Sequence, residues 1–244
     1  MNLKYIIVNE TGMHRTNNED AVCFVKPEKP WVEQAMGSLA IVADGMGGHA
    51  KGEKASRLAV EIISKEYYAK ILPPAKALER ACLIANNTIA KEGSTIDQSI
   101  GTTCTAVAIT HKDLFLLHIG DSRAYLLKSK KLQLLTNDHT LENVGLGQNS
   151  AANYSKNILT KSLGVEAAVD CPAEIIKIEH QLDKTNRILL CSDGLYSYLS
   201  AKEMESSLIE MSLTQIGQHW VKWVLKRGAA DNFSFIVLEL DSPH

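Results

Sequence analysis

The chain alternates between short apolar runs and longer segments with a helical period. Residues 3–8, 38–43 and 187–191 are apolar runs of five or six residues, which is typical of strands buried in a sheet. Over residues 55–66 and 78–89, apolar side chains instead recur every three or four positions. That spacing predicts two amphipathic helices, which would lie in succession on one face of a sheet.

Further along, residues 102–110, 114–119 and 123–127 are strand-like and are joined by short links, which favours antiparallel pairing. Ser200-x-x-Glu203 and Ser212-x-x-Gln215 are capping boxes that predict two more helices. The remaining segments are a closing strand at 233–240, a proline-containing surface loop at 26–37, and a long polar loop at 138–156.

This order of elements predicts the fold class. Strands, two helices, many strands, two helices and a final strand indicate an α+β protein with two central antiparallel sheets and helices on both outer faces, a four-layer α-β-β-α sandwich. With 244 residues and no internal repeat or linker, the chain is expected to form a single domain over residues 1–244.

Composition narrows the function. The formal net charge is −2 and no basic stripe is present, so nucleic acid is not an expected partner. No apolar stretch is long enough to span a membrane, and the N-terminus lacks a signal-peptide layout. The five cysteines include no Cys-x-x-Cys pair, which argues against zinc or dithiol chemistry and favours a reducing cytoplasm.

Acidic residues stand repeatedly at the ends of the apolar runs. The five positions are Glu19-Asp20, Asp44, Asp121, Asp193 and Asp231. Taken alone, the Asp44 position is better explained by an ordinary turn, because Asp-Gly is a common turn dipeptide. Strand ends can converge in space, however, and converging carboxylates repel one another unless cations hold them together. Carboxylate and carbonyl oxygens are the ligands that Mg²⁺ and Mn²⁺ prefer.

These residue types suit one kind of chemistry. Two or three Mg²⁺ or Mn²⁺ ions could share a hydroxide, lower its pKa and offset charge on phosphoryl oxygens, which favours phosphoester hydrolysis. Arg15 is a candidate clamp for the phosphate, although a surface ion pair with Glu19 is the simpler interpretation of that residue alone.

The ordered motifs resemble those of the metal-dependent protein phosphatases of type 2C, and they cover nearly the whole chain. They are Arg15-x-x-x-Glu19-Asp20, Asp44-Gly45-Met46-Gly47-Gly48, Gly101-Thr102-Thr103, Gly120-Asp121-Ser122-Arg123-Ala124, Leu135-Thr136-x-Asp138-His139, Ser192-Asp193-Gly194-Leu195 and Asp231-Asn232. Met46 and the compact length are similar to the bacterial branch. The resemblance implies a serine/threonine phosphoprotein phosphatase that uses two core Mn²⁺ or Mg²⁺ ions and a third, weaker ion.

The resemblance also implies a role for each matching residue. Asp44 would bridge the two core ions, Asp193 and Asp231 would complete the shell of one, and the Gly45 carbonyl with Glu19 acting through water would serve the other. Asp20 would hold the metal-bridging hydroxide, Arg15 would bind substrate phosphate, and Asp121 with Asp193 would hold the third ion. Residues 138–157 would form a flap beside the site.

Two departures from the family pattern stand out. Met46 occupies a position where many eukaryotic members carry a histidine, and a thioether cannot donate a proton. A metal-bound water or another group must therefore protonate the leaving oxygen. Ala229 and Ala230 replace common glycines, and Lys161 replaces a usual arginine.

The expected protein is a cytoplasmic monomer that acts on phosphorylated proteins and opposes a serine/threonine kinase. Two alternatives remain open. One is a catalytically silent member that binds phosphoproteins, which would not need several repelling carboxylates. The other is a hydrolase of small phosphate esters or a nuclease, and the lack of basic surface runs weighs against the nuclease.

Overall fold

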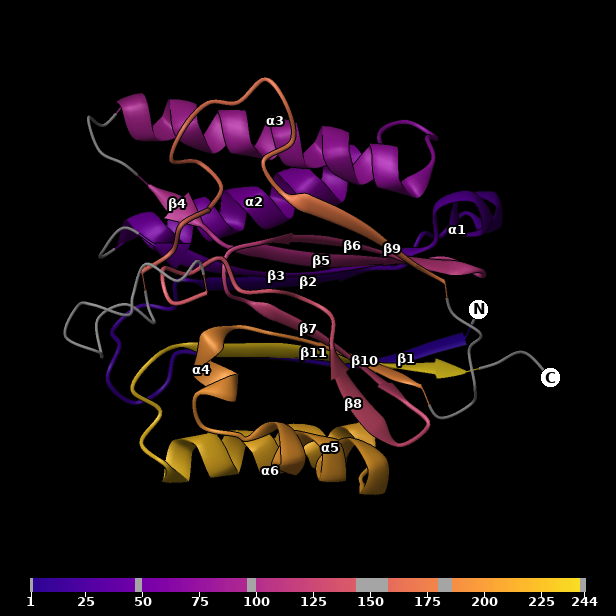
Figure 1. Ribbon diagram of the computed structural model, residues 1–244, viewed down its shortest axis with the longest axis vertical. Coiled ribbons are helices and arrows are strands. Elements are labelled where there is room, and N and C mark those ends of the chain that lie inside the picture. The colour runs from indigo at the N-terminus through magenta and orange to yellow at the C-terminus, as the bar shows by residue number, and fades with distance from the viewer. Residues whose placement is uncertain (1, 47–49, 96–99, 144–157, 180–185, 242–244) are drawn as a thin grey trace.

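Two antiparallel sheets lie face to face, and helices cover the outer face of each sheet (Figure 1). The computed structural model describes residues 2–46, 50–95, 100–143, 158–179 and 186–241. Within these ranges the layers follow the order helix, sheet, sheet, helix, which confirms the predicted α-β-β-α sandwich.

The five-stranded sheet contains both the first and the last strand. Its strands, in spatial order, are β1 (Asn2–Glu10), β11 (Phe233–Asp241), β10 (Arg187–Cys191), β7 (Arg123–Lys128) and β8 (Lys131–Leu134). The β1 strand pairs with β11 over its whole length, from Asn2 opposite Asp241 to Glu10 opposite Phe233. This register brings the loop after β1 next to the residues that precede β11.

The six-stranded sheet carries the central acid. Its strands are β2 (Asp20–Val25), β3 (Ser38–Met46), β5 (Cys104–Ile109), β6 (Asp113–Ile119) and β9 (Glu174–Glu179), with β4 (Gly101–Thr102) paired to the end of β3. The predicted strand at 38–43 continues to Met46, because Gly45 and Met46 pair with Thr102 and Gly101. Asp44 therefore lies within a strand and not at its tip.

Helices α2 (Ala50–Tyr68) and α3 (Pro74–Thr95) cover the six-stranded sheet, while α5 (Ala201–Glu210) and α6 (Leu213–Lys226) cover the other. Both predicted capping boxes are present, with Ser200 and Ser212 as N-caps. The short helix α4 (Asp193–Tyr196) follows β10.

The prediction of a loop over 26–37 was wrong, because residues 30–36 form helix α1 (Pro30–Met36). Proline is tolerated in the first turn of a helix, where its missing N–H would have no intrahelical partner. Met36 is fully buried and packs into the core, which favours the helix over a solvated loop.

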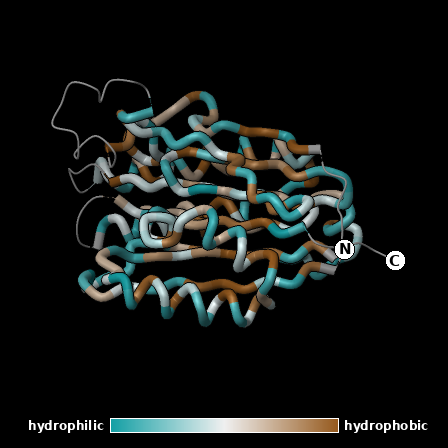
Figure 2. Tube along the Cα trace, turned by 60° about the horizontal axis from the view of Figure 1, so that its bottom comes forward, coloured by the Kyte–Doolittle hydropathy of each residue, from teal (hydrophilic) through white to brown (hydrophobic). Residues whose placement is uncertain are grey.

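Three apolar clusters hold the layers together. Leu116, Leu190 and Ile236 belong to the cluster between the sheets. Ile63 of α2 belongs to the cluster between the six-stranded sheet and its helices, and Trp220 of α6 belongs to the cluster between the five-stranded sheet and its helices. The tube coloured by hydropathy shows hydrophobic segments running through the interior layers (Figure 2). Each fully buried large apolar side chain contributes about 1.5–3 kcal/mol to folding stability, so the core can compensate for strained or charged groups elsewhere.

No helix in the described part of the chain has the length and apolar character needed to cross a bilayer.

Candidate metal and phosphate site

A cavity of about 300 Å³ gathers most of the acids that the sequence singled out. Its lining comprises Arg15, Glu19, Asp44, Gly45, Met46, Thr103, Asp121, Leu159, Asp193, Asp231 and Asn232. Asp20, the remaining predicted site residue, lies beside the cavity and is only 4% exposed. Seven of the eight predicted residues thus line one cavity, and the eighth is adjacent.

Both sheets supply acids to this cavity. Asp20 begins β2 and lies directly opposite Asp44 of β3 in the six-stranded sheet. Asp193 begins α4 immediately after β10, and Asp231 precedes β11. Strands β10 and β11 belong to the five-stranded sheet. Asp121 lies in the turn that leaves β6 in one sheet and enters β7 in the other. Stacking the sheets therefore brings acids together that are up to 212 positions apart in sequence (Glu19 to Asp231).

Glycines allow the backbones around the acids to approach closely. A Cβ atom on Gly45 would lie 2.0 Å from the carbonyl oxygen of Gly52 in α2, and one on Gly194 would lie 1.9 Å from that of Asn232. Gly12 has a φ of +76° and faces the carbonyl oxygen of Asp231. The glycines next to the acids therefore act as contact points between elements.

Buried hydroxyls fix the backbone of Asp44. Its N–H donates to Thr103 Oγ1 at 2.9 Å, and its carbonyl accepts from Thr102 Oγ1 at 2.9 Å and from the Thr103 N–H at 2.8 Å. Thr103 Oγ1 also contacts Ser122 Oγ at 2.7 Å, beside Asp121. The Gly-Thr-Thr and Asp-Ser motifs therefore position the acids, a role that motif matching did not reveal.

Asn232 ties the two ends of the chain together at the site. Its Oδ1 accepts from the Glu19 N–H at 2.9 Å, and its Nδ2 donates to the carbonyls of Thr11 and Asn17 at 2.8 and 2.9 Å. The loop that carries Arg15 and Glu19 is consequently held against the start of β11.

Crowding and burial make these carboxyl groups hard to ionise. Burial raises the pKa of Asp44 well above its usual range, and the charges of Asp20 and Asp193 raise it further. Burial also raises the pKa of Asp20 and of Asp121 to about 7. The pKa of Asp193 rises through burial and the charge of Asp231. A divalent cation would reverse this effect, since it favours the ionised form.

The donor set fits Mn²⁺ or Mg²⁺. It consists of oxygen atoms, and Asp20 Oδ1 is buried without a hydrogen-bond partner among the described residues, while Oδ2 accepts from Ser192 at 2.7 Å. In the described ranges, no three His, Cys, Asp or Glu side chains are arranged so that they could hold a metal ion without rearrangement. Instead, Arg15 Nη2 donates to Asp231 Oδ2 at 2.7 Å. Cation binding would therefore require this ion pair to open.

Asp138 and His139, which belong to one of the matched motifs, make contacts near the turn that carries Asp121. Asp138 forms an ion pair with Arg123, whose guanidinium lies 3.7 Å from the centre of the Tyr196 ring. His139 is buried and His14 is exposed. The predicted flap falls mostly on residues 144–157, and those and His49 lie outside the described residues.

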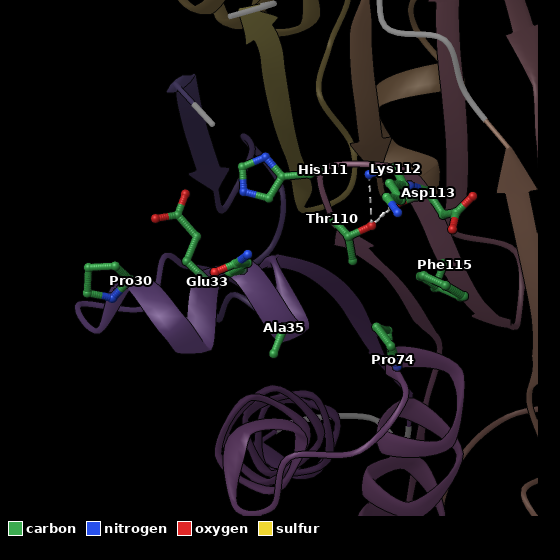
Figure 3. A pocket seen from close by; sticks show the side chains of 10 residues that line it. Pro30, Glu33, Ala35, Pro74, Thr110, His111, Lys112, Asp113 and Phe115 are labelled. Atoms are coloured by element: carbon green, nitrogen blue, oxygen red, sulfur yellow. Dashed lines mark hydrogen bonds between the residues drawn. The ribbon is translucent and has the colours of Figure 1, made fainter.

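A larger cavity, of about 780 Å³, lies at the other end of β5, between helix α1 and the β5–β6 turn (Figure 3). Glu33, His111, Lys112 and Asp113 surround it, and Thr110 Oγ1 accepts from the backbone N–H groups of Lys112 and Asp113. Asp113 is paired with Lys177 at 3.2 Å. The charged residues around this larger cavity are mixed in sign, so it lacks the cluster of acids that a metal site requires.

Comparison with known proteins agrees with this geometry. The family described as protein phosphatase 2C matches residues 14–230. The serine/threonine phosphatase Stp of Listeria monocytogenes is 32% identical over 95% of this chain and 94% of its own length.

Solved structures give the same result. The serine/threonine phosphatase PstP/Ppp of Mycobacterium tuberculosis superposes with a TM-score of 0.82 at 28% identity, covering 98% of this chain and 99% of that one. The catalytic domain of the serine/threonine protein phosphatase PstP in complex with two manganese ions gives a TM-score of 0.80 at 29% identity, with the same coverage. Sequence, fold and the gathered acids agree, and the chain belongs to the protein phosphatase 2C family.

Proposed function

We propose that this protein hydrolyses phosphoserine and phosphothreonine in proteins with the help of bound Mn²⁺ or Mg²⁺. One observation carries the proposal: buried acids from both sheets meet at one cavity where their ionised forms repel one another. Such an arrangement costs folding stability without cations and is compensated when cations bind. When bound, the ions supply Lewis-acid chemistry that activates water and offsets phosphoryl charge.

In this proposal the acids divide the work of holding the ions. Asp44, whose backbone is held by Thr102 and Thr103, would serve both core ions. Asp193 and Asp231 would help to hold one of them. Glu19, through water, and the Gly45 carbonyl would help to hold the other. Asp121, together with Asp193, would hold a third ion.

Asp20 and Arg15 act on the reactants. The Ser192 hydroxyl fixes one carboxylate oxygen of Asp20, which leaves Oδ1 to orient the attacking water. Arg15 is exposed at the mouth of the cavity, and its planar guanidinium suits a phosphate group. Release of Asp231 by Arg15 would free a carboxylate for a cation and a guanidinium for the substrate in one movement.

Protonation of the leaving oxygen requires a group other than Met46, which lines the cavity with a thioether. A water near the ions would supply this proton, because the Met46 thioether has no proton to give.

The physiological setting is also part of the proposal. The substrates are phosphorylated proteins that a serine/threonine kinase produces, residues 138–157 form a flap over the cavity, and residues 1–244 act as one catalytic domain and as a monomer. All five cysteines are free thiols, which supports a cytoplasmic location.

A direct assay tests the proposal. Hydrolysis of an aryl phosphate and of a phosphothreonine peptide is measured with Mn²⁺, with Mg²⁺ and with EDTA. We expect turnover of both substrates with metal and none with EDTA. Turnover that persists in EDTA contradicts the metal mechanism, and no turnover of either substrate at saturating Mn²⁺ indicates a silent phosphoprotein binder.

A further inference from the structure

The first residue of the turn that carries Asp121 is held by a buried side chain outside the acid cluster. This turn, residues 120–122, crosses from β6 in one sheet to β7 in the other. Gly120 has a φ of +103°, and a Cβ atom there would lie 2.6 Å from the Cβ of Thr103. The turn therefore has little room, and small shifts in it change the direction of the Asp121 carboxylate.

His139 makes two hydrogen bonds to Gly120. The Gly120 N–H donates to His139 Nδ1 at 3.1 Å, and the His139 N–H donates to the Gly120 carbonyl at 2.8 Å. Because a backbone N–H can only donate, Nδ1 is unprotonated, and this network assigns the ring proton to Nε2. Nε2 then donates to Glu174 Oε1 at 3.1 Å.

The surroundings keep the His139 ring in this orientation. The residue is 7% exposed, and its ring stacks on His118 with a centroid distance of 4.9 Å. Burial lowers the pKa of His118 to about 4, so the stacked neighbour is a neutral ring near pH 7. The carbonyl of His139 accepts from the Thr160 N–H at 2.8 Å, which joins the chain on both sides of residues 144–157.

The other two backbone carbonyls of the turn accept hydrogen bonds that do not involve His139. Tyr196 donates its hydroxyl hydrogen to the Asp121 carbonyl at 3.0 Å, and Thr105 Oγ1 donates to the Ser122 carbonyl at 2.7 Å. Loss of the His139 acceptor would leave one buried donor, the Gly120 N–H, without its partner.

We propose that His139 is a positioning residue for the third cation: its Nδ1 atom anchors the Gly120 amide and thereby aims Asp121 into the cavity. The inference rests on the proposed function, because it assigns Asp121 to a cation. His139 itself contacts neither substrate nor ion. It acts through the backbone of the turn, as partners of metal ligands commonly do.

Two substitutions separate this role from a merely structural one. His139→Asn places an oxygen acceptor near the position of Nδ1, whereas His139→Gln extends toward the position of Nε2 and Glu174. Both variants lose the imidazole and its stacking on His118, so both are expected to lower the melting temperature. Only His139→Gln leaves the Gly120 N–H without an acceptor.

Three measurements compare the variants with the wild-type protein: calorimetric titration with Mn²⁺, hydrogen exchange of the Gly120 amide in the metal-free protein, and kcat and KM for a phosphothreonine peptide. For His139→Gln we expect the weakest Mn²⁺ step to be about tenfold weaker, with faster Gly120 exchange and a lower kcat at limiting Mn²⁺ that excess Mn²⁺ restores. His139→Asn should stay close to the wild-type protein in all three.

Equal losses in both variants, or an unchanged Mn²⁺ titration and Gly120 exchange rate in His139→Gln, overturn the inference. Absence of turnover in the wild-type protein would refute the proposed function alone. The difference in Gly120 exchange between the two variants would still support or overturn the anchoring role of His139.

Discussion

At one end of the sheets, a cavity of about 300 Å³ is lined by acids from both sheets, and at the other end a cavity of about 780 Å³ is lined by residues of mixed charge. The larger cavity places Asp113 next to Lys177, while the smaller one places Asp44 next to Asp20 and Asp193. We therefore base the proposed site on buried like charges and not on cavity size, because their repulsion must be offset by protonation or by a bound cation.

The largest expected effect comes from Asp193→Asn. The change removes one ligand charge and little volume, so we expect turnover to fall by about a thousandfold or more. Without metal, the variant should unfold at a slightly higher temperature than the wild-type protein, because one member of the repelling set is gone. Steady-state assays with Mn²⁺ and melting curves in EDTA measure the two effects.

The matched control for this change is Asp113→Asn at the opposite end, which should leave turnover unchanged. A near-normal rate in Asp193→Asn, or an equal loss in Asp113→Asn, would contradict the contrast between the two cavities.

Stability should depend on pH in the metal-free protein. Asp20 and Asp121 have folded-state pKa values of about 7, above the ordinary value of 3.8, so the folded protein binds more protons than the unfolded chain between these values. Stability should therefore fall as pH rises from about 4 to 7, by on the order of a few kcal/mol. Urea unfolding at pH 5 and pH 8 in EDTA measures this fall.

Saturating Mn²⁺ should reduce this pH dependence, since the ions stabilise the ionised carboxylates. Parallel pH profiles with and without Mn²⁺ would show that the acids are not the cation site.

Gly45→Ala tests the close contact between β3 and α2. The new methyl group would lie 2.0 Å from the Gly52 carbonyl oxygen, so the elements must separate, and we expect a loss of about 2–3 kcal/mol in unfolding free energy. Mn²⁺ affinity should fall as well, because Asp44 precedes this position. Chemical denaturation and calorimetry provide the measurements.

Gly228→Ala is the comparison variant for this substitution. Gly228 has a φ of +111° and nothing within 4 Å of a built Cβ atom, so only about 1 kcal/mol of backbone strain is expected there, without an effect on Mn²⁺. Equal effects of the two substitutions would mean that backbone contact at Gly45 does not matter.

The smallest effect should come from Arg15→Lys, which keeps the charge and loses the planar fork. We expect kcat/KM for a phosphopeptide to fall about tenfold, mainly through KM. Arg57→Lys on the exposed face of α2 serves as the control and should change nothing. A fall in kcat alone would indicate that Arg15 acts in the chemical step and not in phosphate binding.

Much of the frame could be predicted because its signals are local. The capping boxes at Ser200 and Ser212 and the apolar periods of α2 and α3 all follow from residues within one or two turns of each other. Helix α1 was missed, because its seven residues span only about two turns, too short for a period to stand out, and Met36 becomes buried only against other parts of the core.

For the site, the sequence by itself determined which residue types are present and in what order: acids at the ends of apolar runs, glycines beside them and an arginine near the start. Only the tertiary structure decided that Arg15 pairs with Asp231, that Gly45 touches Gly52, and that His139 holds the turn before Asp121. The reason is physical. Hydrophobic periods and caps are set by neighbours along the chain, whereas charge repulsion, desolvation and backbone contact depend on distances that exist only once the two sheets have packed together.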